Sequence, residues 1–191
     1  MDQGILTFEP EEHVYRVDGI RRISVTEAIS KGGYPPSAYF TEEGKIRGKA
    51  VHTGVFLDID DDLDRSNLHP MIEGYLRGWF KFRAEARFVP IRELCELPQW
   101  NHEHDYVGTP DVVGYLNGKA MVCDVKTGDS STARYQVNAY SMFPQIAALA
   151  PCVGKYGLRL RPDGTYRLDS YTNPNDWLKF IECLKKAKGY L

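Results

Sequence analysis

The sequence predicts an α/β fold in which helices flank a mixed central sheet. An Asn-Gly dipeptide at 117–118 separates two runs rich in Val, Tyr and Met, which is the strongest short-range signal for a β-hairpin. Helical patterns precede this hairpin, and a helix, two strands and a last helix follow it. With 191 residues the chain is long enough to bury a substantial core, so we expect a single domain over 1–191.

Residues 1–35 predict an N-terminal β-hairpin followed by a short helix. Residues 5–8 and 13–17 alternate between apolar and polar side chains, and Asp18-Gly19 supplies the tight turn before a returning strand. The stretch from Ser24 to Glu27 resembles a capping box, because the Glu27 carboxylate can reach back to the N–H of the cap residue.

Two helices are expected next, over residues 42–57 and 69–87. The first carries Arg47-Gly48 and, one turn after the glycine and on the same side, His52. A glycine at that place lets a backbone or a phosphate approach closely. A lone helical histidine is more often a packed or surface residue than a ligand, so the pattern alone gives His52 no role.

The segment between these helices, residues 58–64, alternates aspartate with other residues. A calcium loop would need Gly where Leu63 stands and a bidentate Glu where His69 stands. We therefore expect a solvated acidic loop.

The approach to the hairpin is predicted as a strand over 88–97, stopped by Pro98, and a polar loop over 100–105. Glu96 comes at the end of this strand, just ahead of the hairpin.

The hairpin itself brings together charged side chains. A two-residue turn at 117–118 puts Asp111 directly opposite Asp124, and Lys126 points to the same face because side chains alternate along a strand. Like charges in this position repel, and Mg²⁺ or Mn²⁺ bridging the two carboxylates would offset the repulsion. The alternative without a functional site is an exposed hairpin with ordinary surface charges. Apolar neighbours on both faces, such as Val113 and Val122, favour a buried central strand instead.

Beyond the hairpin we expect a helix from about residue 132 that carries Gln136 and Tyr140 on one face. Pro144 interrupts this helix near the end of the core region, 42–150. Two strands joined by a Pro-Asp-Gly turn and a final helix then occupy residues 151–191.

Composition excludes several classes of protein. The net charge of −2 gives no bulk electrostatic attraction to nucleic acid, so any such binding must rest on a local basic patch. The four cysteines are far apart and contain no C-x-x-C, which argues against a zinc ribbon or a disulfide framework. No apolar run approaches the roughly 20 residues of a membrane span, and no signal peptide is evident, so we expect a cytoplasmic protein without a membrane partner.

Thr109-Pro110-Asp111 followed by Asp124-Val125-Lys126 resembles the signature of the PD-(D/E)XK nucleases. Arg47-Gly48 with His52 upstream, and Gln136 with Tyr140 downstream, resemble the further motifs of the RecB-like branch. That branch includes phage-type exonucleases and the mitochondrial genome maintenance exonucleases. His13-x-Tyr15 and the Ser-Val-Thr26 stretch are similar to the N-terminal hairpin and helix of the same branch.

The resemblance implies a restriction-endonuclease-like α-β-β-β-α-β core and hydrolysis of phosphodiester bonds with Mg²⁺ or Mn²⁺. It also implies roles for two sets of residues, one catalytic and one that binds the metal. The catalytic residues are Asp111, Asp124, Lys126, Gln136 and Tyr140. The metal ligands are His52, Glu96, Asp111, Asp124 and the carbonyl of Val125. Arg47, Gln136 and Tyr140 are expected to contact DNA, with Lys49 and Arg134 as further phosphate contacts. The clustered late cysteines that hold an iron-sulfur cluster in some relatives are missing here, so no cluster is expected.

The function expected from these residues is a metal-dependent DNA exonuclease that acts at DNA ends or on single strands in recombination, repair or replication. A recombination or annealing protein is a possible partner. No helix-turn-helix or zinc finger is evident that would read bases, which makes a sequence-specific enzyme the second choice. The alternatives are a structure-specific or restriction-like endonuclease on the same core, and a non-catalytic module that binds DNA or a partner.

Overall fold

The computed structural model describes residues 4–35, 41–128 and 131–191. Its strands are β1 (Leu6–Glu9), β2 (Val14–Val17), β3 (Ile20–Arg22), β4 (Phe88–Pro90), β5 (Gln99–Asn101), β6 (Tyr106–Gly108), β7 (Val112–Leu116), β8 (Lys119–Lys126), β9 (Gly154–Leu160) and β10 (Tyr166–Ser170). Its helices are α1 (Val25–Lys31), α2 (Glu42–Ile59), α3 (Pro70–Glu85), η1 (Arg92–Leu94), α4 (Ala133–Tyr140), α5 (Pro144–Ala147) and α6 (Asn175–Ala187).

A mixed five-stranded sheet forms the centre of the molecule, with strand order β10-β9-β8-β7-β4. Only β8 and β9 run parallel to each other, and the helical crossover that such a pair requires is supplied by α4 and α5. The other neighbours are antiparallel. The predicted α/β class with a mixed sheet is therefore correct.

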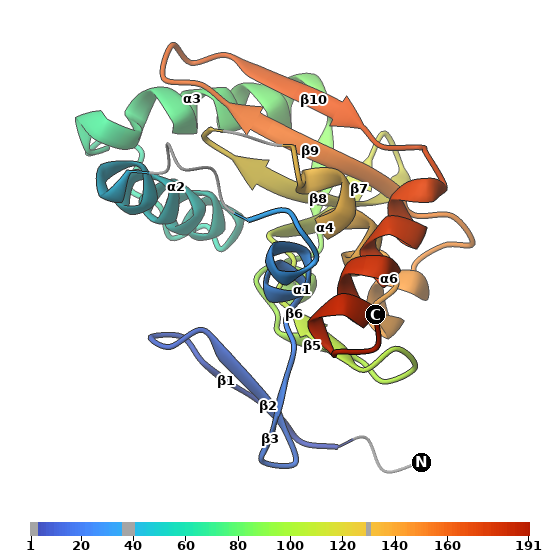
Figure 1. Cartoon of the computed structure of the whole chain (residues 1–191). Helices are drawn as coiled ribbons and strands as arrows, with labels where there is room; N and C mark the ends of the chain where they lie inside the picture. The colour runs from blue at the N-terminus through green and yellow to red at the C-terminus, as the bar shows by residue number, and fades with distance from the viewer. Residues whose placement is uncertain (1–3, 36–40, 129–130) are drawn as a thin grey trace.

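Helices cover both faces of this sheet (Figure 1). On one face, α2 and α3 pack against the side chains of Met121, Cys123 and Val125. On the other face, α1, α4 and α6 pack against Val113 and Val122. The alternation of these side chains places Asp124 and Lys126 on the α4 face, at the carboxyl end of β8.

The hairpin of β7 and β8 has the predicted register, with Val112 opposite Cys123. Its turn is also as predicted, because Asn117 and Gly118 both have positive φ, 49° and 76°. Gly114 has a different task. A Cβ there would lie 2.3 Å from the carbonyl oxygen of Val89, so only glycine lets β4 approach at this point.

The N-terminal strands form a separate three-stranded antiparallel sheet, β1-β2-β3, rather than a hairpin alone. Tyr15 and Val17 of β2 pack on Val107 of β6. Asp18 and Gly19 make the predicted tight turn, with φ of 52° and 76°. Figure 1 shows this small sheet projecting from the body of the molecule beneath β5 and β6.

The predictions for residues 88–105 were only partly correct. The strand predicted over 88–97 ends at Pro90 and gives way to η1, and the loop predicted over 100–105 begins within β5, which pairs with β6. Proline has no N–H to extend a ladder. The β5–β6 turn is held locally, since the Asn101 side-chain oxygen accepts a 2.9 Å hydrogen bond from the N–H of His104.

The acidic loop predicted over 58–64 was also wrong at its start. Asp58 belongs to α2 and is 2 % exposed. Its carboxylate accepts hydrogen bonds from Trp79 Nε1 (2.7 Å), Arg83 Nη1 (2.6 Å) and Arg65 Nε (2.9 Å). These donors offset the cost of burying the charge, so Asp58 joins α2 to α3 instead of facing solvent.

We predict that Asp58→Ala lowers the free energy of unfolding by about 1.5–3 kcal/mol, the usual loss for hydrogen bonds to a charged group. Urea denaturation measures this. Asp60→Ala, two residues further along at the end of α2, is the matched control. Its partner Arg92 has a 56 % exposed side chain, and such an exposed pair contributes less than about 1 kcal/mol. Equal losses in the two variants would contradict the structural role of Asp58.

Candidate metal and nucleic-acid site

The residues singled out in the sequence meet in one open cavity of about 820 Å³ at the carboxyl end of β8. Ligands of open α/β sheets bind outside this end of the strands. The cavity is lined by Asp111, Asp124, Val125, Lys126, Glu96, His52, Arg47, Lys49, Gln136 and Tyr140. Every residue proposed for catalysis or metal binding is therefore at its wall.

Asp111 lies one residue before β7 and closes the open end of the hairpin. Its Oδ2 accepts a 2.7 Å hydrogen bond from the N–H of Val125, where a neighbouring strand would otherwise supply the acceptor. Its Oδ1 lies 3.4 Å from Nδ1 of His52. Burial alone would raise the pKa of Asp111, but the charges of His52 and Lys126 and the Val125 N–H outweigh it and lower this pKa.

His52 and Glu96 reach the same point from different elements. His52 comes from the middle of α2, and its Nδ1 lies 4.0 Å from Oε1 of Glu96. Glu96 follows η1 with φ of 53°, a left-handed conformation that costs energy for a residue other than glycine. Its N–H donates to the carbonyl of Pro110 at 2.9 Å, which fixes it beside Asp111. Strain of this kind is typical of functional sites.

The charges of this group raise two pKa values. Burial would lower the pKa of His52, but the charge of Asp111 and the hydrogen bond to it raise this pKa to about 9. Burial and the charge of Asp111 raise the pKa of Glu96 to about 8. Near neutral pH the metal-free site therefore holds a proton on each of the two side chains.

Asp124 and Lys126 form a pair beside this group. Asp124 is 1 % exposed, and Lys126 Nζ lies 2.9 Å from its Oδ1 and 2.8 Å from its Oδ2. Burial raises the pKa of Asp124 to about 6 although Lys126 opposes this. Burial would lower the pKa of Lys126, but Asp124 and Asp111 raise it, so the ammonium stays charged.

Repulsion between the two aspartates, which was expected to require a cation, is already offset by protein groups. Asp111 and Asp124 follow the predicted register, yet their carboxylates are not left to repel each other. The Val125 N–H and His52 hold the first, and Lys126 holds the second. A cation is not required merely to keep this hairpin folded.

The donor set nonetheless fits a hard divalent cation. His52, Glu96 and Asp111 each offer one ligand atom, and these three atoms lie within 4.8 Å of one another. Nearby, the carboxylate of buried Asp124 is held by the Lys126 ammonium, which lies 2.9 Å from Oδ1 and 2.8 Å from Oδ2. Carboxylate oxygens with one imidazole suit Mg²⁺ or Mn²⁺.

Val125 was expected to contribute its carbonyl. Its side chain packs in the core between the sheet and α2, so only its backbone is available to a ligand in the cavity. The N–H is already donated to Asp111, which leaves the carbonyl.

The expected phosphate contacts surround this group. Gln136 and Tyr140 lie on successive turns of α4, only 7 % and 4 % exposed, and both line the cavity. Arg47 also lines it, with its guanidinium 5.6 Å from the ring centre of Tyr75. The buried Nε of Arg47 has no hydrogen-bond partner among the described residues.

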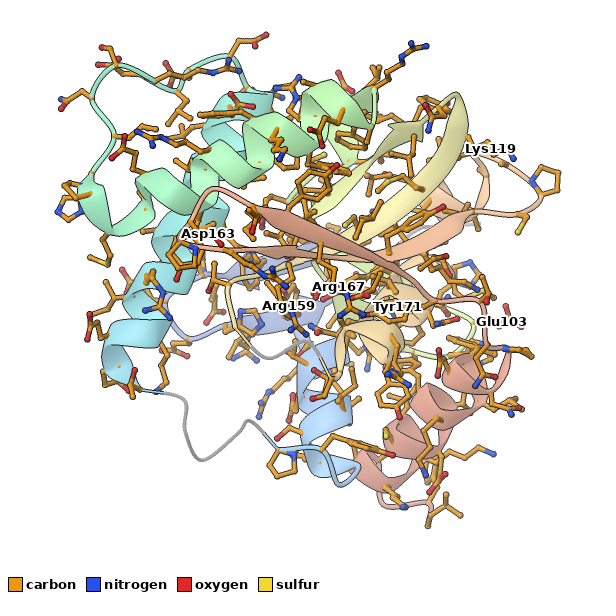
Figure 2. The ribbon with its side chains drawn as sticks, turned by 90° about the horizontal axis from the view of Figure 1, so that it is seen from above. Glu103, Lys119, Arg159, Asp163, Arg167 and Tyr171 are labelled. Atoms are coloured by element: carbon orange, nitrogen blue, oxygen red, sulfur yellow. The ribbon has the colours of Figure 1, made fainter. Side chains whose placement is uncertain are left out.

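Arg134 lies elsewhere. It lines a second cavity, about 520 Å³, together with Arg159, Arg167 and Tyr171. Figure 2 shows these last three side chains gathered beside β9 and β10. Arg134 therefore does not line the cavity of the metal group, and its contact with a backbone phosphate stays a prediction.

The sequence did not predict the hydrogen bond between Tyr15 and Thr109, which joins the N-terminal sheet to the segment before Asp111. Tyr15 is 2 % exposed, and its hydroxyl lies 2.8 Å from Oγ1 of Thr109, two residues before Asp111. Tyr15 alternates with half-buried residues on a short strand, which indicates a buried side chain but does not identify its partner.

No family model and no curated protein sequence matches this chain. Among the described residues no helix combines the length and the apolar character that crossing a membrane requires.

We predict that the metal-free protein becomes less stable as the pH rises from 6.5 to 9. The folded state holds protons on His52 up to about pH 9 and on Glu96 up to about pH 8, whereas the unfolded chain releases them at ordinary values of 6.5 and 4.5. The stabilisation from His52 is complete below pH 6.5, and both contributions disappear as the pH rises. Urea midpoints measured in EDTA test this.

The variant Glu96→Gln should show a shallower loss of stability over the same pH range, because one titrating group is removed. Glu43→Gln, at an exposed position of α2, is the matched control and should follow the wild type. A wild-type midpoint that rises between pH 6.5 and 9 would contradict the proposed electrostatics.

Proposed function

We propose that this protein is a divalent-metal-dependent deoxyribonuclease. The observation that carries the proposal is the convergence of three carboxylates, one imidazole and one ammonium on a single open cavity. These groups belong to Asp111, Asp124, Glu96, His52 and Lys126. Taken without η1, β5, β6 and α5, the chain order α3-β4-β7-β8-α4-β9 is similar to the α-β-β-β-α-β core that the resemblance to PD-(D/E)XK nucleases implies, which supports the proposal.

In this proposal His52, Glu96 and Asp111 hold a Mg²⁺ or Mn²⁺ ion, with Asp124 and the Val125 carbonyl as further ligands. When bound, the ion supplies positive charge that lowers the pKa of a water molecule and stabilises the negative charge that develops on the phosphate. The left-handed backbone at Glu96 and the Val125 N–H at Asp111 hold the two carboxylates in place for this task.

Lys126 contributes a fixed positive charge. Its raised pKa means that it is an ammonium at neutral pH, so it cannot accept a proton from water. It instead donates hydrogen bonds to the attacking water or to a phosphoryl oxygen. Asp124 holds this ammonium in place from 2.8 Å and thereby orients it.

Gln136 and Tyr140 donate hydrogen bonds to the scissile phosphate or its neighbour. Burial raises the pKa of the Tyr140 hydroxyl well above its ordinary value, so it remains a donor at every physiological pH. Arg47 and Lys49 on α2 neutralise further backbone phosphates without reading the base sequence.

We favour an exonuclease acting at DNA ends or on single strands. No described element presents a separate helix that could read bases in a duplex groove, which favours ends or single strands over sequence-specific cutting. A structure-specific endonuclease on the same core is the second candidate, because a rim open to solvent also admits a continuous strand.

The predicted activity is loss of end-labelled linear DNA in Mg²⁺ or Mn²⁺, with circular DNA left intact. Lys126→Ala should lower the rate by about 100-fold or more, since it removes a charge that stabilises the transition state. Lys119→Ala is the matched control, because Lys119 is an exposed lysine at the opposite end of the same strand β8, labelled in Figure 2. It should keep the wild-type rate.

Cutting of circular DNA would identify an endonuclease instead. No cleavage of any substrate by folded protein that binds Mn²⁺ in calorimetry would contradict the catalytic proposal and leave a DNA-binding module.

A further inference from the structure

A cluster of aromatic rings lies on the rim of the same cavity and takes no part in the proposed chemistry. Phe8 of β1, His13 at the turn and Tyr15 of β2 all line the cavity. The Phe8 and Tyr15 rings are stacked, with centroids 4.3 Å apart and planes at 23°. The His13 ring stands edge-on to both, at 5.5 and 5.4 Å.

This cluster is only partly covered by protein. Tyr15 is buried, but Phe8 is half-buried and His13 is exposed. His13 also has φ of 52°, a left-handed conformation that is uncommon for a residue other than glycine. Rings that served only the core of the small sheet would not need to extend into the cavity.

The cluster is fixed in position relative to the metal group. The Tyr15 hydroxyl is hydrogen-bonded to Thr109, two residues before Asp111. A β-bridge between Ser24 and Val107 attaches the chain that follows the small sheet to β6. The stacked rings and the carboxylates therefore belong to one rigid framework, as a site that positions a substrate requires.

Basic side chains line the same cavity. They belong to Lys45, Arg47 and Lys49 of α2. In the view of Figure 1 the turn between β1 and β2 lies below α2. Proteins that hold single strands combine these features: a basic surface follows the phosphates while aromatic rings stack with the bases.

We propose that the Phe8 ring is a stacking platform for one unpaired base of a single-stranded DNA substrate, and that His13, whose ring stands at 88° to that of Phe8, forms the edge of this platform. This inference deepens the proposed nuclease function and rests on it for the direction of the strand, with phosphates toward α2 and Lys126. Bases in a duplex have both faces covered by their neighbours, so the platform selects single strands or frayed ends over intact duplex.

Binding of a short fluorescent oligothymidylate tests the platform without relying on cleavage. Fluorescence anisotropy is recorded in Ca²⁺, and gels verify that the strand stays intact. Phe8→Ala should weaken binding by about 5- to 150-fold, the range that base–aromatic stacking supports. Phe8→Trp, which keeps an aromatic ring, should bind like the wild type and shows that a loss in Phe8→Ala does not come from misfolding.

Thr7→Ala is the matched control, because Thr7 alternates with Phe8 on β1 and points to the other face. A scan with abasic nucleotides locates the base. In the wild type one abasic position should weaken binding, and in Phe8→Ala the same change should have no further effect, because the stacking partner is already gone.

Unchanged affinity of folded Phe8→Ala would overturn the inference, as would an abasic effect that persists in this variant. Failure of the wild type to bind any single strand would overturn it too. These outcomes are distinct from failure of the nuclease proposal. If the protein cuts duplex ends and Phe8→Ala binds single strands with full affinity, the nuclease proposal stands and only the platform is rejected.

Discussion

The hydrogen bond from the Val125 N–H to the Asp111 carboxylate is the contact on which the site depends. Asp111 precedes the first residue of β7, and Val125 is the second-last residue of β8. At this point the Asp111 side chain, instead of the backbone of a neighbouring strand, accepts the hydrogen bond. With this hydrogen bond made, the other carboxylate oxygen of Asp111 faces His52, and Asp124 and Lys126 lie beside it. The rest of the sheet serves to keep that open end in register, through the tight turn at Asn117 and Gly118.

Charge balance explains why so many ionisable groups can share one cavity. The metal-free protein carries protons on His52 and Glu96 and keeps Lys126 charged, which compensates the ionised aspartates. A divalent cation would replace those protons with its own charge, because metal ligands must be deprotonated. The same groups thus balance the charge of the metal-free site, and in the proposed function they bind Mg²⁺ or Mn²⁺.

Much of this arrangement followed from the sequence, and the failures have physical causes. The β7–β8 register could be predicted because an Asn-Gly turn leaves no freedom in pairing. Residues 88–105 could not, because short edge strands such as β4 and β5 are fixed by tertiary contacts rather than by a long alternating pattern. Asp58 was misjudged for a similar reason: its partners Trp79 and Arg83 come from another helix, and nothing local marks it as buried.

The most direct test of the central claim is the anomalous scattering of Mn²⁺ in crystals of the wild-type protein. The account predicts a peak between the carboxylates of Asp111 and Glu96 and the imidazole of His52, and its loss in Asp111→Asn. A well-ordered site without a peak, or manganese bound only outside this cavity, would contradict it.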